Sequence, residues 1–177
     1  MKAVLLDDEM AMERPIKTSG TDLLRRRVHL RAAFTSCQGV TLLHLCAEFN
    51  SSRCARVLLD AGADLNAPAD IDADGFGGHS PIFHTVNSIH NHCRPMMELL
   101  LERGATLDVR VEGLLWGQDM DWVTVVVDTT PLSYAQCGLY QQFHRRQDDV
   151  YSNLAYLYEQ RFGHSLRVAN VPNKYLA

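Results

Sequence analysis

Apolar residues recur at helical spacing in two short runs between residues 39 and 66. The first run comprises Leu43, Cys46 and Ala47, and the second comprises Cys54, Val57 and Leu58. Asn50 and Ser51 interrupt the pattern between the runs, and Gly62 stands where a helix would end in the left-handed conformation. Two helices this short cannot bury their own apolar faces, so they must stack on similar units. The pattern therefore predicts a helix pair that belongs to a repeat array.

The two ends of this stretch resemble an ankyrin repeat. The usual opening of that family, G-x-T-P-L-H-x-A-A, is matched at Gly39, Thr41, Leu43, His44, Cys46 and Ala47. The usual close, L-L-x-x-G-A-D-V-N, is matched at Leu58, Leu59, Gly62, Ala63, Asp64, Leu65 and Asn66. Leu42 departs from the pattern, which has proline at that position. The resemblance implies a mainly α fold, an ankyrin-repeat solenoid of stacked helix pairs, and a role in protein–protein interaction.

Two further copies of the unit are recognisable. The second keeps Gly78, Ser80, Pro81, Ile82, Leu100, Leu101, Gly104 and Ala105, with Phe83 at the usual histidine position and His84 one place later. The third keeps Thr130, Pro131, Leu132 and Ala135, followed by an outer helix near residues 148–160. We therefore expect one domain over residues 1–177. It divides into a degenerate capping repeat (1–38), repeats at 39–77, 78–106 and 129–163, an insertion at 107–128 and a C-terminal tail at 164–177.

The N-terminal segment is expected to cap the stack with two helices. Val4, Leu5, Met10 and Met12 suggest a first helix that ends at Pro15, and the run TDLLRRRVHL (21–30) suggests a second. Four arginines, Arg25, Arg26, Arg27 and Arg31, would give the cap the polar outer face that the end of an array needs. The alternative is that these arginines form an anionic docking site.

Residues 107–128 fit the repeat pattern least. LDVRVEGLL (107–115) partly alternates, and WVTVVVD (122–128) is rich in β-branched residues, so the segment predicts an elongated β-hairpin with its turn near 117–121. Trp116 and Trp122 bracket the turn, beside Asp119 and Asp121. The tryptophans either pack against each other or onto neighbouring helices, or else they form a projecting contact surface, because tryptophan is favoured at interface hot spots. These four residues are the candidate partner-binding site.

Two clusters raise a metal-binding or metal-stabilised module as the alternative function. Asp70, Asp72 and Asp74 resemble the first half of a calcium loop, but the position that should hold the closing glutamate is Pro81. His90, His92 and Cys93 lie too close together in the chain for the usual pairs of a structural zinc site. Neither cluster is complete, so we expect no resident metal and no cofactor.

Composition narrows the class of protein. The 46% hydrophobic and 21% charged content fits a soluble globular chain without a membrane span, and a net charge of −4 argues against general nucleic-acid binding. Five cysteines, an odd number, resemble small core residues in a reducing compartment more than a disulfide framework. No nucleophile elbow, P-loop or dinucleotide-binding motif is present, so we do not expect an enzyme. We expect a cytoplasmic monomer that binds a protein partner.

Overall fold

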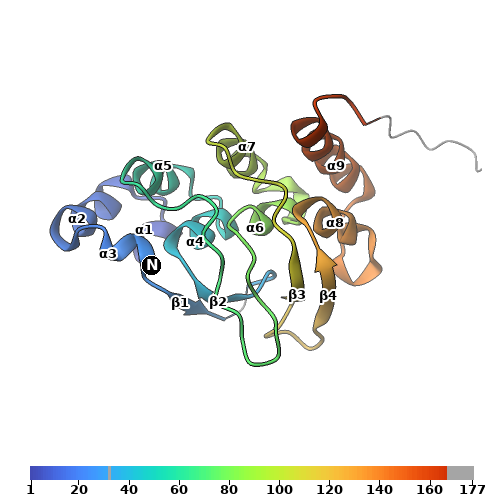
Figure 1. Ribbon diagram of the computed structural model, residues 1–177, viewed down its shortest axis with the longest axis horizontal. Coiled ribbons are helices and arrows are strands. Elements are labelled where there is room, and N and C mark those ends of the chain that lie inside the picture. Colours follow the sequence, from blue (N-terminus) through green and yellow to red (C-terminus); the bar gives the residue numbers. More distant parts are fainter. Residues whose placement is uncertain (32, 167–177) are drawn as a thin grey trace, which may run out of the picture.

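Three helix pairs lie side by side in the computed structural model, which describes residues 1–31 and 33–166. The inner helices are α4 (Leu42–Glu48), α6 (Phe83–Val86) and α8 (Pro131–Gln136), and the outer helices are α5 (Ser52–Asp60), α7 (Arg94–Glu102) and α9 (Gln147–Phe162). Each inner helix contacts the outer helix that follows it and the next inner helix in the row (Figure 1). The helices thus form two rows, with the core between them.

The first pair follows the predicted pattern, with one difference. The backbone N–H of Thr41, the N-cap of α4, donates to Nδ1 of His44 at 3.2 Å. The predicted apolar stripe on α4 is buried, but so is the rest of the helix up to Ala47, because neighbours enclose it. Gly62 ends the pair with φ of +91°, and Ala63 donates to the carbonyl of Leu58 at 2.9 Å.

The second and third pairs contain extra turns between their helices. In the second pair, a 3-10 turn at Ile89–Asn91 follows the short α6. In the third pair, two 3-10 turns, Cys137–Leu139 and Gln141–Phe143, separate α8 from α9. Thr130 caps α8 by accepting from the N–H of Ser133 at 3.3 Å. Phe143, in the last of these turns, is fully buried, so this insertion contributes to the core.

The N-terminal prediction is wrong in two places. Pro15 does not end a helix but lies inside α2 (Glu9–Ser19), which follows the short α1 (Lys2–Leu5). Proline removes only one helical hydrogen bond, and α2 continues because Asp8 caps it, Met12 is buried and the helix packs on α5. The second helix, α3, covers only Asp22–Arg25. The residues after it form strand β1, because pairing with β2 outweighs their local helix preference.

Two hairpins and a loop project from the same side of the helix rows (Figure 1). Strands β1 (Val28–Leu30) and β2 (Cys37–Val40) pair ahead of α4. Strands β3 (Val111–Trp116) and β4 (Thr124–Thr129) form the hairpin that the sequence predicted ahead of α8. The loop at residues 67–78 lies between them, because Asp70 donates to the carbonyl of Gly39 and Gly77 to that of Gly113, both at 2.9 Å.

The far ends of the two hairpins also meet. The N–H of Ser36 donates to the carbonyl of Leu115 at 3.0 Å, and the N–H of Gly117 donates to the carbonyl of Phe34 at 2.7 Å. The predicted tail at 164–177 falls, for residues 167–177, outside the described residues. The backbone contacts between the two hairpins position the candidate sites described next.

Candidate functional site

The turn of the β3–β4 hairpin presents an exposed apolar surface beside acidic groups. Trp122 is 56% exposed, and Met120 and Val123 beside it are also exposed. Asp119 and Asp121 are exposed on the same turn. Gly117 begins the turn with φ of +71°, and Met120 donates back to its carbonyl at 2.9 Å. Three of the four predicted contact residues are therefore accessible, on a turn held by backbone hydrogen bonds.

Trp116 lies in a different environment from Trp122. It is 3% exposed and stacks on Phe34 and on Phe143, with ring centroids 5.5 Å and 4.3 Å away. Arg145 lies over the rings of Phe34 and Trp116 at 5.0 Å and 5.9 Å. The sequence left two alternatives for the tryptophans, packing or a contact surface. Trp116 is a packing residue, and it offers no free surface. It fixes the base from which the turn projects.

The outer face of β4 continues the exposed surface of the turn. Val125 and Val127 are exposed, whereas Val126 between them is buried, as the two-residue period of a strand requires. A groove of about 400 Å³ runs beside this strand, with Leu139 and Tyr140 on its far wall. Apolar surface thus extends from the hairpin turn toward the C-terminal end of α8.

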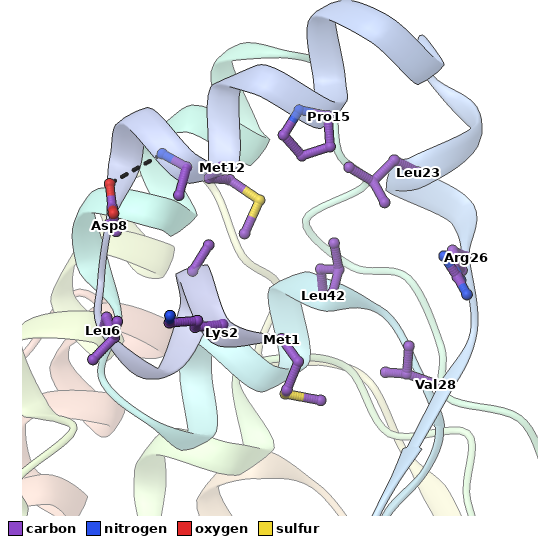
Figure 2. A pocket seen from close by; sticks show the side chains of 12 residues that line it. Met1, Lys2, Leu6, Asp8, Met12, Pro15, Leu23, Arg26, Val28 and Leu42 are labelled. Carbon is purple, nitrogen blue, oxygen red and sulfur yellow. Dashed lines mark hydrogen bonds between the residues drawn. The ribbon is translucent and has the colours of Figure 1, made fainter.

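A second groove lies at the other end of the stack and is mostly apolar. Its volume is about 610 Å³, and Figure 2 shows Met1, Met12, Leu23 and Leu42 among its lining side chains. The polar side chains that line it are Lys2, Asp8 and Arg26, and that of Asp8 caps α2 through the N–H of Ala11 (Figure 2). The groove therefore lies between the N-terminal helices and α4, and its lining residues include no converging set of reactive groups.

A network of buried polar side chains crosses the inner helices. His44 accepts from the N–H of Thr41, so its proton lies on Nε2, which donates to the carbonyl of His79 at 3.0 Å. Nε2 of His79 lies 3.1 Å from both the carbonyl of Ser36 and Nε2 of His84. Burial lowers the pKa of His44 to about 3 and lowers that of His79 well below its usual value. Both rings are therefore neutral in the folded protein at neutral pH.

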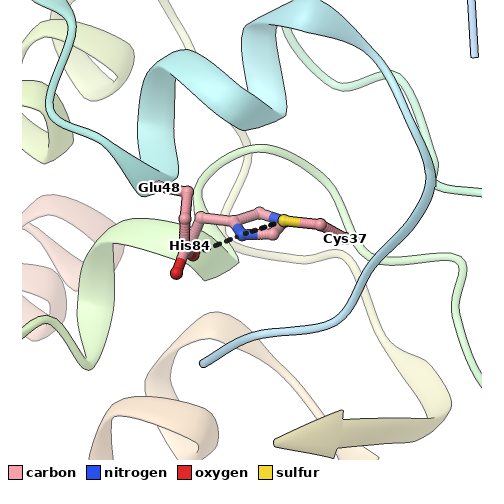
Figure 3. A group of neighbouring side chains, drawn as sticks. All are labelled: Cys37, Glu48 and His84. Atoms are coloured by element: carbon pink, nitrogen blue, oxygen red, sulfur yellow. Dashed lines mark hydrogen bonds and ion pairs between the residues drawn. The ribbon is translucent and has the colours of Figure 1, made fainter. Parts of the chain in front are cut away.

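The network ends where three different chemical groups meet: an imidazole, a carboxylate and a thiol. Figure 3 shows His84 between Glu48 and Cys37: its Nδ1 lies 2.8 Å from Oε2 of Glu48 and 3.9 Å from Sγ of Cys37. Strand β2 supplies the thiol, the end of α4 supplies the carboxylate, and α6 supplies the imidazole. A cavity of about 500 Å³, lined by Glu48, His84 and Phe34, opens beside them.

These three groups are not arranged for nucleophilic catalysis. In a Cys–His–acid arrangement the thiol and the acid contact opposite ring nitrogens, whereas Cys37 and Glu48 both face Nδ1 of His84. Cys37 is also only 2% exposed. Burial, followed by the charge of Glu48, raises the pKa of its thiol far above the usual value, so the reactive thiolate is disfavoured.

The structure separates both clusters that the sequence singled out for metal. Asp72 accepts from the N–H groups of Asp74 and Phe76 at 3.0 and 2.9 Å and so closes its own loop, while Asp70 pairs with Arg27 at 3.4 Å. His90 and His92 are exposed, but Cys93 is buried and its thiol donates to the carbonyl of Glu48 at 3.4 Å. Neither arrangement supports the metal-binding alternative as it was formulated from the sequence.

Sequence reasoning missed the group formed by Cys37, Glu48 and His84. The only signal was the displacement of His84 by one place from the usual histidine position, which turns its ring toward α4 and β2 instead of toward the capping turn. Cys37 and Glu48 carried no signal, because each stands alone in its own segment.

Comparisons with known proteins agree with this architecture. The family model for the ankyrin repeat matches residues 38–70. Human B-cell lymphoma 3 protein is 37% identical over 70 residues, which make up 40% of this chain and 14% of that protein. This chain therefore spans only a small part of that relative. Within the described residues, no helix is long and apolar enough to cross a membrane. The resemblance seen at residues 39–66 is confirmed.

Proposed function

We propose, from the premise that this chain is an ankyrin-repeat protein, that it is a non-catalytic scaffold for protein–protein interaction. The observation that carries the proposal is the exposed turn of the β3–β4 hairpin, where Trp122 stands beside Asp119 and Asp121. A tryptophan exposed over more than half its surface, on a turn anchored by a buried one, is a preformed anchor for a partner.

The three repeats and the capping helices form, in this proposal, one solenoid over the divisions at 1–38, 39–77, 78–106 and 129–163. The inner helices and the projecting hairpins then make a continuous surface, and the 107–128 hairpin extends it. The β1–β2 hairpin, the loop at residues 67–78 and the β3–β4 hairpin are the fingers of this arrangement. Contacts between successive inner helices and backbone hydrogen bonds between successive fingers support it. We further propose a cytoplasmic monomer. Five free, buried cysteines support the reducing compartment.

The test is an affinity capture that compares matched aromatic substitutions. Trp122→Ala removes the proposed anchor, whereas Phe162→Ala removes a comparably exposed aromatic side chain from α9. Partners retained by the unmodified chain should be lost with Trp122→Ala and kept with Phe162→Ala. Asp119→Asn combined with Asp121→Asn should weaken the same partners and reduce the salt dependence of their binding.

A second variant replaces residues 118–122 with Asn-Gly and leaves Trp116 in place. The shortened turn should keep the helical circular dichroism and lose the partner, because the helical stack does not include the turn. Undiminished capture by both this variant and Trp122→Ala would move the contact surface elsewhere on the molecule.

A further inference from the structure

We propose that Cys37, Glu48 and His84 form a binding site for one transition-metal ion of the zinc type. The site goes beyond the scaffold function, since it involves a different surface and needs no partner. Within the described residues, these three side chains place a sulfur, an oxygen and a nitrogen atom within 4.8 Å of one another. They come from three separate elements, β2, α4 and α6, so the fold itself brings them together (Figure 3).

The separations of the ligand atoms suit tetrahedral coordination. Zinc bonds of about 2.0 Å to nitrogen or oxygen and about 2.3 Å to sulfur place neighbouring ligand atoms about 3.3–3.6 Å apart. The observed separations from Nδ1 of His84, 2.8 Å to Glu48 and 3.9 Å to Cys37, bracket that range. A metal ion inserted among the three atoms would replace the hydrogen bond between Glu48 and His84. Small side-chain adjustments then complete three of the four positions.

The donor set selects the class of ion. A thiolate and an imidazole favour zinc and similar ions, while calcium and magnesium require sites made of oxygen atoms. A divalent ion with one thiolate and one carboxylate forms a group without net charge. This neutrality suits a site in which Cys37 and His84 are buried and the Glu48 side chain is 10% exposed.

Neighbouring groups hold two of the ligands in position. The second carboxylate oxygen of Glu48 accepts from the N–H of Phe34 at 3.2 Å, which leaves Oε2 directed at His84. Nε2 of His84, the nitrogen opposite the proposed ligand atom, faces Nε2 of His79 at 3.1 Å. A metal ion on Nδ1 leaves the proton of His84 on Nε2, so Nε2 of His84 then donates to Nε2 of His79, whose own proton moves to Nδ1.

The cavity beside the site provides access and a fourth ligand position. Its volume of about 500 Å³ admits water, and Glu48 and His84 both line it. The site therefore corresponds to a three-ligand arrangement with one open position rather than to a closed structural centre.

Cobalt(II) is the probe, because thiolate-bound tetrahedral cobalt has a charge-transfer absorption and intense visible bands. The purified chain, stripped with chelator, should bind one equivalent with both signatures, and zinc should abolish them by displacement. Cys37→Ser should remove the thiolate band and weaken binding by more than about 10-fold, because even the loss of an outer-shell partner costs about that much. Binding should also weaken as pH falls, because the metal displaces the thiol proton.

Cys54→Ser is the matched control. Cys54 is equally buried, its thiol donates to the backbone carbonyl of Ala3 at 3.3 Å, and it lies in α5. This variant should keep the full cobalt spectrum. Glu48→Gln is the second ligand variant. It keeps the shape of the side chain, so it guards against loss of folding, and it should keep the thiolate band at lower affinity. An octahedral spectrum without a thiolate band in the unmodified chain, or an unchanged spectrum in Cys37→Ser, would overturn the site.

Discussion

At the scale of single residues, burial separates side chains that look alike in the sequence. Trp116 and Trp122 bracket one turn, yet they are 3% and 56% exposed. His44 and His79 are enclosed in the stack, whereas His90 stands in solvent. The enclosed histidines must stay neutral in the folded protein, because burial disfavours their charged form and, among the described residues, their rings bond to backbone, hydroxyl and imidazole groups. This asymmetry makes the stability of the fold depend on pH.

Acidification should destabilise the chain through His44. Its pKa falls from 6.5 in the unfolded chain to about 3 in the fold, so the unfolded state binds more protons throughout that window. The contribution of neutral His44 to the free energy of unfolding is therefore complete above about pH 6.5. It declines as pH falls below that value, by about 1.4 kcal/mol per pH unit for one such histidine. Urea unfolding of His44→Gln between pH 6 and about pH 4 should show a slope flatter by that amount. Parallel curves for the two proteins would mean that His44 ionises inside the fold.

At the scale of elements, prediction from sequence succeeded where the determinants are local. The helix pair between residues 42 and 60 follows from apolar spacing, a polar break at Asn50 and Ser51 and a closing glycine, all local to the segment. The prediction failed at Pro15 and Val28, where contacts with α5 and β2 outweigh local preference. The group of Cys37, Glu48 and His84 could not be predicted, because its members lie on three elements whose packing no spacing reveals.

The contact between neighbouring fingers should tolerate no side chain at Gly39. Gly39 has φ of +59°, and an added Cβ would lie 2.3 Å from Cβ of Asp70. Gly62 also has a positive φ, +91°, but an added Cβ there meets nothing within 4 Å. Gly62→Ala therefore measures backbone strain alone, about 1–2 kcal/mol. Gly39→Ala should cost about 1–3 kcal/mol more, through crowding against Asp70. Chemical denaturation compares the two variants, and equal costs would show that the finger contact yields easily.

At the scale of the whole molecule, the two hairpins join helix pairs that are far apart in the sequence. Phe34 comes from the first hairpin, Trp116 from the second and Phe143 from the turn after α8, and their rings form one stack. Backbone hydrogen bonds connect the same segments from residue 34 to residue 117. Contacts between neighbouring helix pairs are thereby supplemented by a contact that links the first hairpin to the third helix pair. Such a link opposes the stepwise unfolding to which long arrays are prone.

The chain should therefore unfold in one cooperative transition. Trp122→Phe leaves Trp116 as the single tryptophan, because the sequence contains two. The fluorescence of this protein then reports on the ring stack between hairpins, while far-UV circular dichroism reports on the helices. If the stack couples the two, both probes should give the same midpoint in urea. Trp122→Phe should itself change stability little, since the ring it replaces is exposed. A fluorescence transition at lower urea would show that the hairpins separate while the helix pairs remain folded, which would make the fingers an independent, weaker layer of the structure.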